Sequence, residues 1–107
     1  MAIYDLYGSL SDDIHGAKEI LEKTLGIRLE SRDSGYMGGE YFQFGQTSDE
    51  HFVLKRNHDP FDGGPAEMSF PLHRILLYLN DTTRATELRE KILETKRFVA
   101  LRHEDLD

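Results

Sequence analysis

Cysteine and tryptophan are absent from this chain of 107 residues, proline occurs three times, and no apolar run is long enough to cross a membrane. The absence of cysteine excludes disulfides, thiolate nucleophiles and cysteine-ligated metal sites, and it is typical of a reducing compartment. No basic segment precedes a hydrophobic stretch near the first residue, so we expect neither a signal peptide nor a membrane anchor. We therefore expect a cytoplasmic protein.

Basic residues are also scarce, since 13 Lys and Arg stand against 20 Asp and Glu, for a formal net charge of -7. Because each contact with a phosphate group requires a cation, this balance disfavours direct binding to nucleic acid. The hydrophobic share of 38% is sufficient for a core, and a chain this short is expected to form a single domain over residues 1–107.

Two segments have the periodicity of amphipathic helices. In the first, Ser11 is placed to cap the helix and Gly26 to end it. The apolar residues between them recur at steps of three and four: Ile14, Ala17, Leu21 and Leu25. The second helix is expected from about residues 81–83 to Lys96, with a supporting pair of Glu87 and Lys91. Its apolar stripe consists of Ala85, Leu88 and Ile92.

Short apolar or alternating runs predict strands elsewhere, at Ile3–Tyr7, Ile27–Glu30, Tyr41–Phe44, Phe52–Leu54, Arg74–Leu79 and Phe98–Leu101. The run Arg74–Leu79 is the most hydrophobic and is expected at the centre of the sheet. Turns are expected at Gly35, Gly38–Gly39, Gly45 and Asn57–Pro65, and residues 104–107 are expected to fray. The order β-α-β-β-β-β-α-β predicts an α+β domain: a mainly antiparallel sheet of five to six strands with two helices on one face.

No familiar arrangement for catalysis or metal binding is present in the sequence. The element order suggests half of a vicinal-oxygen-chelate module, but that site needs a quartet of His and Glu, and only His51 with Glu40 can be placed. No serine lies in a Gly-x-Ser-x-Gly elbow. The pairs Gly38–Gly39 and Gly63–Gly64 match no phosphate-binding loop and are explained by tight turns. We therefore expect no metal, no cofactor and no enzymatic activity.

The middle third of the chain is acidic and rich in Phe and Tyr. Between residues 33 and 67, seven carboxylates are accompanied only by the cations Lys55 and Arg56. An ordinary acidic surface over an aromatic core explains this pattern. From the composition of this window alone, the ordinary surface is the favoured interpretation. A protein that binds a basic partner also needs such a pattern, because carboxylates steer and pair cations while rings supply buried contact area.

The segment Glu30–Phe42 contains the pattern Arg-Asp-Ser-x-Tyr-x-Gly-Gly, and Asn57–Pro60, Phe70–Pro71 and Ile75–Leu77 follow it. In these segments the chain resembles a family of small immunity proteins, which are encoded beside polymorphic and contact-dependent growth inhibition toxins of Gram-negative bacteria. The resemblance implies a non-catalytic cytoplasmic inhibitor. Its partner would be the toxic C-terminal domain of a large exported effector, often a basic nuclease.

Carboxylates of such an inhibitor can occupy the positions of phosphates on a nuclease, or clamp the surface beside its active site. The residues expected in this contact are Asp33, Tyr36, Glu40, Asp59 and Asp62, with Asp49 and Glu50 as rim charges that speed association. Local turn chemistry explains Asp33 and Ser34 as well, so both interpretations stay open. Two alternatives also stay open: a small enzyme or ligand-binding domain of vicinal-oxygen-chelate or ferredoxin-like type, and a subunit that self-associates through an exposed strand edge.

Overall fold

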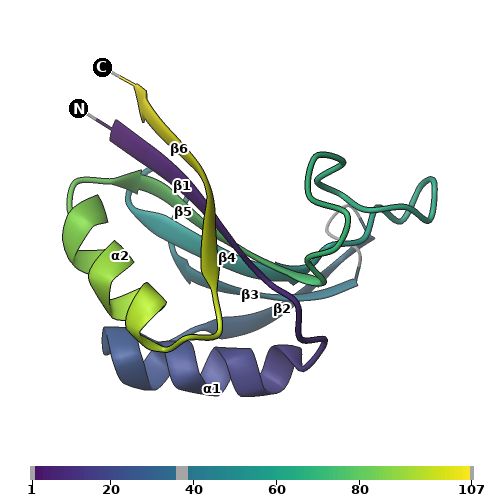
Figure 1. The fold of residues 1–107 in the computed structure, drawn as a ribbon, viewed down its shortest axis with the longest axis horizontal. Helices are drawn as coiled ribbons and strands as arrows, with labels where there is room; N and C mark the ends of the chain where they lie inside the picture. Colours follow the sequence, from purple (N-terminus) through teal and green to yellow (C-terminus); the bar gives the residue numbers. More distant parts are fainter. Residues whose placement is uncertain (1, 36–38, 107) are drawn as a thin grey trace.

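The computed structural model describes residues 2–35 and 39–106. Within them the chain forms a six-stranded sheet in the order β2-β3-β4-β5-β1-β6, in which all neighbouring strands are antiparallel. The elements are β1 (Ala2–Ser9), α1 (Ile14–Leu25), β2 (Glu30–Ser34), β3 (Gly39–Gly45), β4 (His51–Arg56), β5 (Ile75–Thr82), α2 (Ala85–Glu94) and β6 (Val99–Leu106). Both helices lie on one face of the sheet (Figure 1), which confirms the predicted fold class.

Helix α1 buries the predicted stripe and ends as predicted. Gly26 adopts a left-handed conformation with φ of 66°, and its N–H donates to the carbonyl of Glu22. The predicted cap was wrong: the side chain of Asp13 accepts the N–H of Gly16 at 3.0 Å, while Ser11 Oγ accepts the N–H of Asp13. Ser11 therefore shapes the turn before the helix, and the capping carboxylate lies where the helix dipole favours an anion.

Helix α2 is shorter than predicted, because Thr82 still belongs to β5 and the helix begins only after Arg84. The predicted stripe of Ala85, Leu88 and Ile92 is buried, and Lys91 lies 3.6 Å from Glu87. At the other end Lys96 has a φ of 60°, a left-handed conformation for which glycine is the usual residue.

Two strand predictions were displaced at their ends. Ile27–Glu30 is not a strand except for its last residue, because Leu29 is buried and its N–H donates to a Glu22 carboxylate oxygen at 2.8 Å. The strand is the mostly exposed segment Glu30–Ser34, so Asp33 and Ser34 lie in β2 and not in a turn. Residues 104–106 do not fray, since they extend β6 along residues 2–4 of β1.

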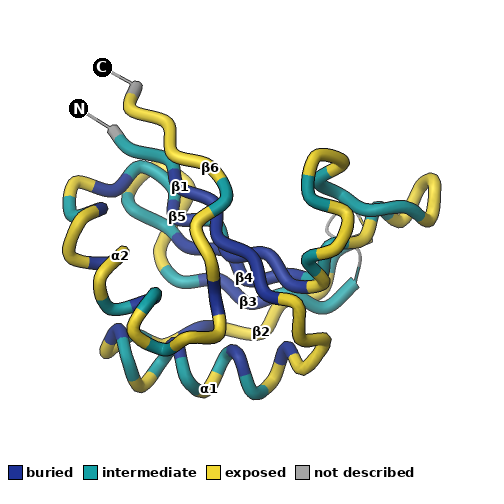
Figure 2. Tube along the Cα trace, viewed as in Figure 1, coloured by how far each residue is buried: buried dark blue, intermediate teal, exposed yellow. Residues whose placement is uncertain are grey.

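The two faces of the sheet differ in what covers them. On the helix-facing side, large apolar side chains of four strands form the core with α1 and α2: Tyr7, Phe42, Phe52, Leu54, Leu77 and Leu79. On the opposite face, Lys55 of β4 pairs with Leu76 of β5, and both are buried although no helix lies there. Figure 2 shows these central strands as buried, with the segment 57–74 between β4 and β5 projecting from one end of the sheet. The interior position of β5 confirms the prediction for Arg74–Leu79.

Candidate functional site

The antiparallel order gathers most of the connections at one end of the sheet. Arg56, the last residue of β4, pairs with Ile75, and Ser9, the last residue of β1, pairs with the same residue. Val99 at the start of β6 pairs with Gly8. We call this region the loop end and define it by residues 10–13, 33–35, 39–40, 57–74 and 95–98. Its longest segment, residues 57–74, projects on the right of Figure 1, whereas the connection from α2 to β6 lies at the lower centre.

The structure brings four of the predicted site residues to the loop end and separates two from it. Asp33, Glu40, Asp59 and Asp62 lie at the loop end. Asp49 and Glu50 lie in or beside the β3–β4 turn, at the other end of β3 and roughly 17 Å away along that strand. Tyr36 lies outside the described residues.

The loop end carries an excess of negative charge. Its ranges hold seven carboxylates against Arg74, Lys96 and Arg97. Asp33 and Glu40 are directly opposite each other in the β2–β3 pair, and like charges in this arrangement destabilise a sheet. Within the described residues Asp33 has no ion-pair partner, while Glu40 lies 3.4 Å from His15 Nε2. The stability of the β2–β3 pair therefore does not explain why both positions carry a carboxylate.

The segment 57–74 is 18 residues long and contains no helix or strand, a length that in compact domains is uncommon and usually functional. Asn57 fixes both sides of it. Its Nδ2 donates to the carbonyl oxygens of Phe70 (2.9 Å) and His73 (2.8 Å), and its Oδ1 accepts the N–H of Glu67 at 2.9 Å. This amide side chain thus adds to the backbone hydrogen bonds of the segment, such as those from the N–H of Phe70 to Glu67 and from the N–H of Asn57 to Arg74.

The tip of this segment is shaped by two carboxylates. Asp59 Oδ1 accepts the N–H of Phe61, and Asp62 Oδ1 accepts the N–H of Gly64, both at 2.8 Å. The N–H of Asp59 also donates to the carbonyl of Gly64 at 2.7 Å. Each carboxylate therefore uses one oxygen to hold the turn and keeps a second oxygen for other contacts. Both interpretations of these residues, fold maintenance and partner contact, are compatible with this geometry.

Glu67 anchors the middle of the segment to the open face of the sheet. It accepts a hydrogen bond from the Tyr78 hydroxyl at 2.6 Å, and Arg102 Nη1 lies 3.2 Å from its Oε1. Burial alone would raise the pKa of Glu67, but the hydrogen bonds from Tyr78 and Arg102 hold it below its usual value. Burial and the contact with Glu67 raise the pKa of Tyr78. Lys55 is buried nearby, and its burial lowers its pKa despite the charges of Asp59 and Glu67.

All the large apolar side chains that are exposed in the described part of the chain lie at or beside the loop end. Three belong to the segment 57–74, namely Phe61 (77% exposed), Met68 (80%) and Leu72 (77%). Leu10 (67%) follows β1, and Val99 (51%) begins β6. Exposed apolar side chains supply surface that is desolvated when a partner binds, so this end of the molecule is the better candidate for an interaction site. The sequence prediction missed them, although the length of the segment and its three prolines were a usable signal.

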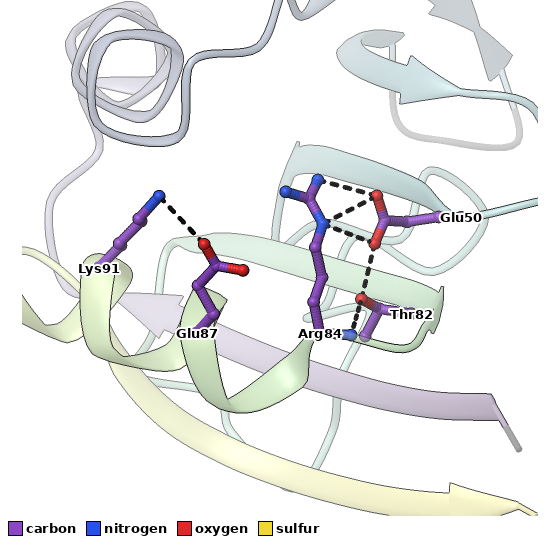
Figure 3. A network of polar contacts seen from close by, with 5 residues as sticks. All are labelled: Glu50, Thr82, Arg84, Glu87 and Lys91. Carbon is purple, nitrogen blue, oxygen red and sulfur yellow. Dashed lines mark hydrogen bonds and ion pairs between the residues drawn. The ribbon is translucent and has the colours of Figure 1, made fainter.

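At the opposite end, Glu50 is already engaged by its own chain. Arg84 donates to both of its carboxylate oxygens at 2.8–3.2 Å, and the Thr82 hydroxyl donates at 2.7 Å (Figure 3). These hydrogen bonds, those from Arg84 above all, hold the pKa of Glu50 below its usual value despite burial. Glu50 therefore joins the β3–β4 turn to the start of α2.

The described residues contain no group of three His, Asp or Glu side chains that could hold a metal ion. The pair that could be placed from sequence is separated: Glu40 lies near the start of β3, whereas His51 begins β4 and pairs with Gly45 at the end of β3. Asp5 Oδ1 and His103 Nδ1 lie 2.5 Å apart between β1 and β6, an arrangement that orients a catalytic histidine in some hydrolases. In the described part of the chain, however, no hydroxyl is hydrogen-bonded to the other nitrogen of His103.

Comparison with known proteins adds no identification, since no family model and no curated protein matches the sequence. Among the described residues, neither helix is long and apolar enough to span a membrane.

Proposed function

We propose that the chain is a non-catalytic immunity protein that binds a basic toxin domain, such as a nuclease, in the cytoplasm and neutralises it. The observation that carries the proposal is the loop end. There an 18-residue segment, fixed by its own hydrogen bonds, presents exposed apolar side chains beside carboxylates. The resemblance of Glu30–Phe42 and the later segments to immunity proteins supports the same function.

The chemistry of the loop end suits a protein partner with a cationic surface. Exposed apolar side chains such as Met68 and Leu72 supply contact area that is desolvated on binding. The surrounding carboxylates steer a positively charged partner and raise its rate of association. A segment that is already ordered loses little conformational entropy on binding, which favours high affinity.

The size of the chain is sufficient for a tight complex. Neutralising a toxin requires a Kd of about 1 nM or lower, or about -12 kcal/mol of binding free energy. A standard interface covers ~800 Å² of each partner, or about an eighth of the 6368 Å² surface of this chain.

The test is to combine the purified chain with the toxin domain encoded by the adjacent gene. We expect an equimolar complex in size-exclusion chromatography with light scattering, loss of toxin activity, and protection of cells that express both. Met68→Ala with Leu72→Ala should weaken binding at least tenfold, because two exposed contacts are lost without disturbing the core. Asp49→Asn, at the other end of the molecule, is the matched control. Failure of the chain to bind or inhibit the toxin, or turnover of a small molecule by the chain alone, would contradict the proposal.

A further inference from the structure

A pocket of about 370 Å³ opens at the loop end, beside the segment 57–74. Its apolar lining comes from Leu10 after β1 and from Phe98 and Val99 at the start of β6. Its polar lining includes His73, Lys96 and Arg97. The volume lies within the range of small-molecule sites, and an apolar lining with a few polar groups is their usual composition.

The wall of this pocket depends on the absence of a side chain at Gly8. A Cβ placed there would lie 2.6 Å from Leu101 Cδ1 and 3.0 Å from the His73 side chain. Both neighbours therefore pack directly on the backbone of β1. His73 Nδ1 is buried without a hydrogen-bond partner in the described residues.

Two cations at the pocket, Lys96 and Arg97, have no ion-pair partner among residues 2–35 and 39–106. Both side chains are exposed. Asp12, close in sequence to the lining residue Ser11, lies 3.7 Å from Arg74. An anion bound in the pocket would thus meet two available positive charges.

The backbone at Lys96 supports a role beyond folding. Its φ of 60° is the left-handed conformation that follows many helices, where glycine avoids a steric cost that every other residue pays. Residues kept in such conformations cluster at functional sites. Compared with glycine, lysine at this position lowers the stability of the fold, but it places a cation at the pocket.

We propose that this pocket binds a carboxylic acid that carries a branched or aromatic hydrocarbon group about the size of a leucine or phenylalanine side chain. The hydrocarbon packs among Leu10, Phe98 and Val99, and the carboxylate faces Lys96 and Arg97. The same chemistry is offered by a free acid and by the C-terminal residue of a peptide. This inference goes beyond the proposed function, and its test needs no toxin.

The experiment is an NMR titration of the full chain with isocaproate, and separately with N-acetylglycyl-leucine. A ligand this small is expected to bind with a Kd of about 1 mM. We expect saturable shifts of the Leu10, His73 and Val99 resonances with at least one of the two probes. Tighter binding of isocaproate assigns the site to free acids, and tighter binding of the peptide assigns it to chain termini.

Three controls distinguish specific binding in the pocket from non-specific association with the protein. Isocaproamide, which has the same shape without the charge, should bind at least tenfold more weakly. Lys96→Gly should bind at least tenfold more weakly while its Tm is equal to or higher than that of the wild type, since glycine relieves the left-handed strain. Lys23→Gln, on the exposed side of α1, should bind as the wild type does. Absence of saturable binding by both acids, equal binding of the amide, or undiminished binding by the folded Lys96→Gly variant would each overturn the proposal.

Discussion

At the scale of single residues, two leucines four positions apart show how context decides what a side chain does. Leu72 is 77% exposed in the projecting segment, whereas Leu76 is fully buried in β5 on the face of the sheet that no helix covers. Leu76 pairs with Lys55 of β4 on one side and Gly8 of β1 on the other, and Lys55 and the nearby Leu6 and Val53 are buried as well. The open face thus has a small apolar layer of its own.

Leu76→Ala is expected to lower the free energy of unfolding by about 2–5 kcal/mol, because it leaves a cavity in this layer. Leu72→Ala should change it by less than about 0.5 kcal/mol, since no buried contact is lost. Urea denaturation of both variants checks the pair. A negligible loss for Leu76→Ala would contradict the placement of β5.

Glu50→Gln is expected to lower stability by about 1 kcal/mol, because it removes the charge that Arg84 pairs with at a partly exposed site. Asp49→Asn, at an exposed neighbour without an ion pair in the described residues, should have almost no effect. Thermal unfolding of the two variants under the same conditions measures the difference. Equal stability of both would show that the Glu50–Arg84 contact does not tie the β3–β4 turn to α2.

At the scale of elements, the segment 57–74 is a structured loop although it has no helix or strand. Asn57 holds it from within, and Glu67 holds it to Tyr78 of β5 and Arg102 of β6. The tip with Phe61 lies beyond these anchors. The segment can therefore present side chains to a partner without first becoming ordered.

Asn57→Ala should release this segment without unfolding the sheet. Three hydrogen bonds are lost, one of which satisfies the N–H of Glu67. The local free energy of unfolding should therefore fall by about 1–3 kcal/mol. Hydrogen exchange is expected to show faster exchange across residues 58–73 and unchanged protection in β4 and β5. His58→Ala, at the exposed neighbouring position, is the control. Unchanged exchange in the Asn57 variant would mean that another contact orders the segment.

The elements also show which features sequence patterns can predict. Apolar periodicity predicted both helices and the central strand, because burial of one face leaves a regular signal in the chain. It failed for β2, a mostly exposed strand whose position is set by pairing with β3, and for the end of β6, which is set by pairing with β1. For the candidate site, the sequence pointed to the carboxylates of the middle third, and their role in binding stays a prediction. The division of these carboxylates between two ends of the sheet follows from the tertiary structure, and so does the position of the exposed apolar side chains. A local sequence pattern predicts neither.

At the scale of the whole molecule, three glutamates make the free energy of unfolding depend on pH. The pKa of Glu22 is lowered, chiefly by the hydrogen bond from the N–H of Leu29, and the pKa values of Glu50 and Glu67 are also lowered. A carboxylate with a folded pKa below its unfolded value stabilises the fold above the unfolded value. That contribution is lost as the pH falls through the folded value.

The free energy of unfolding should therefore lose the contribution of these residues as the pH falls below their ordinary value of 4.5. Replacing Glu22, Glu50 and Glu67 by Gln should lower stability near neutral pH and flatten the loss in acid. Urea denaturation across this pH range provides the measurement. An equally steep loss in the triple variant would assign the acid sensitivity to other groups.

The two ends of the molecule differ. Carboxylates and exposed apolar side chains lie at the loop end, and the Glu50–Arg84 contact lies at the other end. The kinetics of toxin binding at low and high salt test whether the toxin docks at the loop end. Asp59→Asn with Asp62→Asn keeps the oxygens that hold the turn and removes both charges. We predict roughly tenfold slower association at low salt, a difference that shrinks at high salt, and an unchanged rate for Asp49→Asn. A double variant that associates as fast as the wild type, together with slower association of Asp49→Asn, would contradict docking at the loop end.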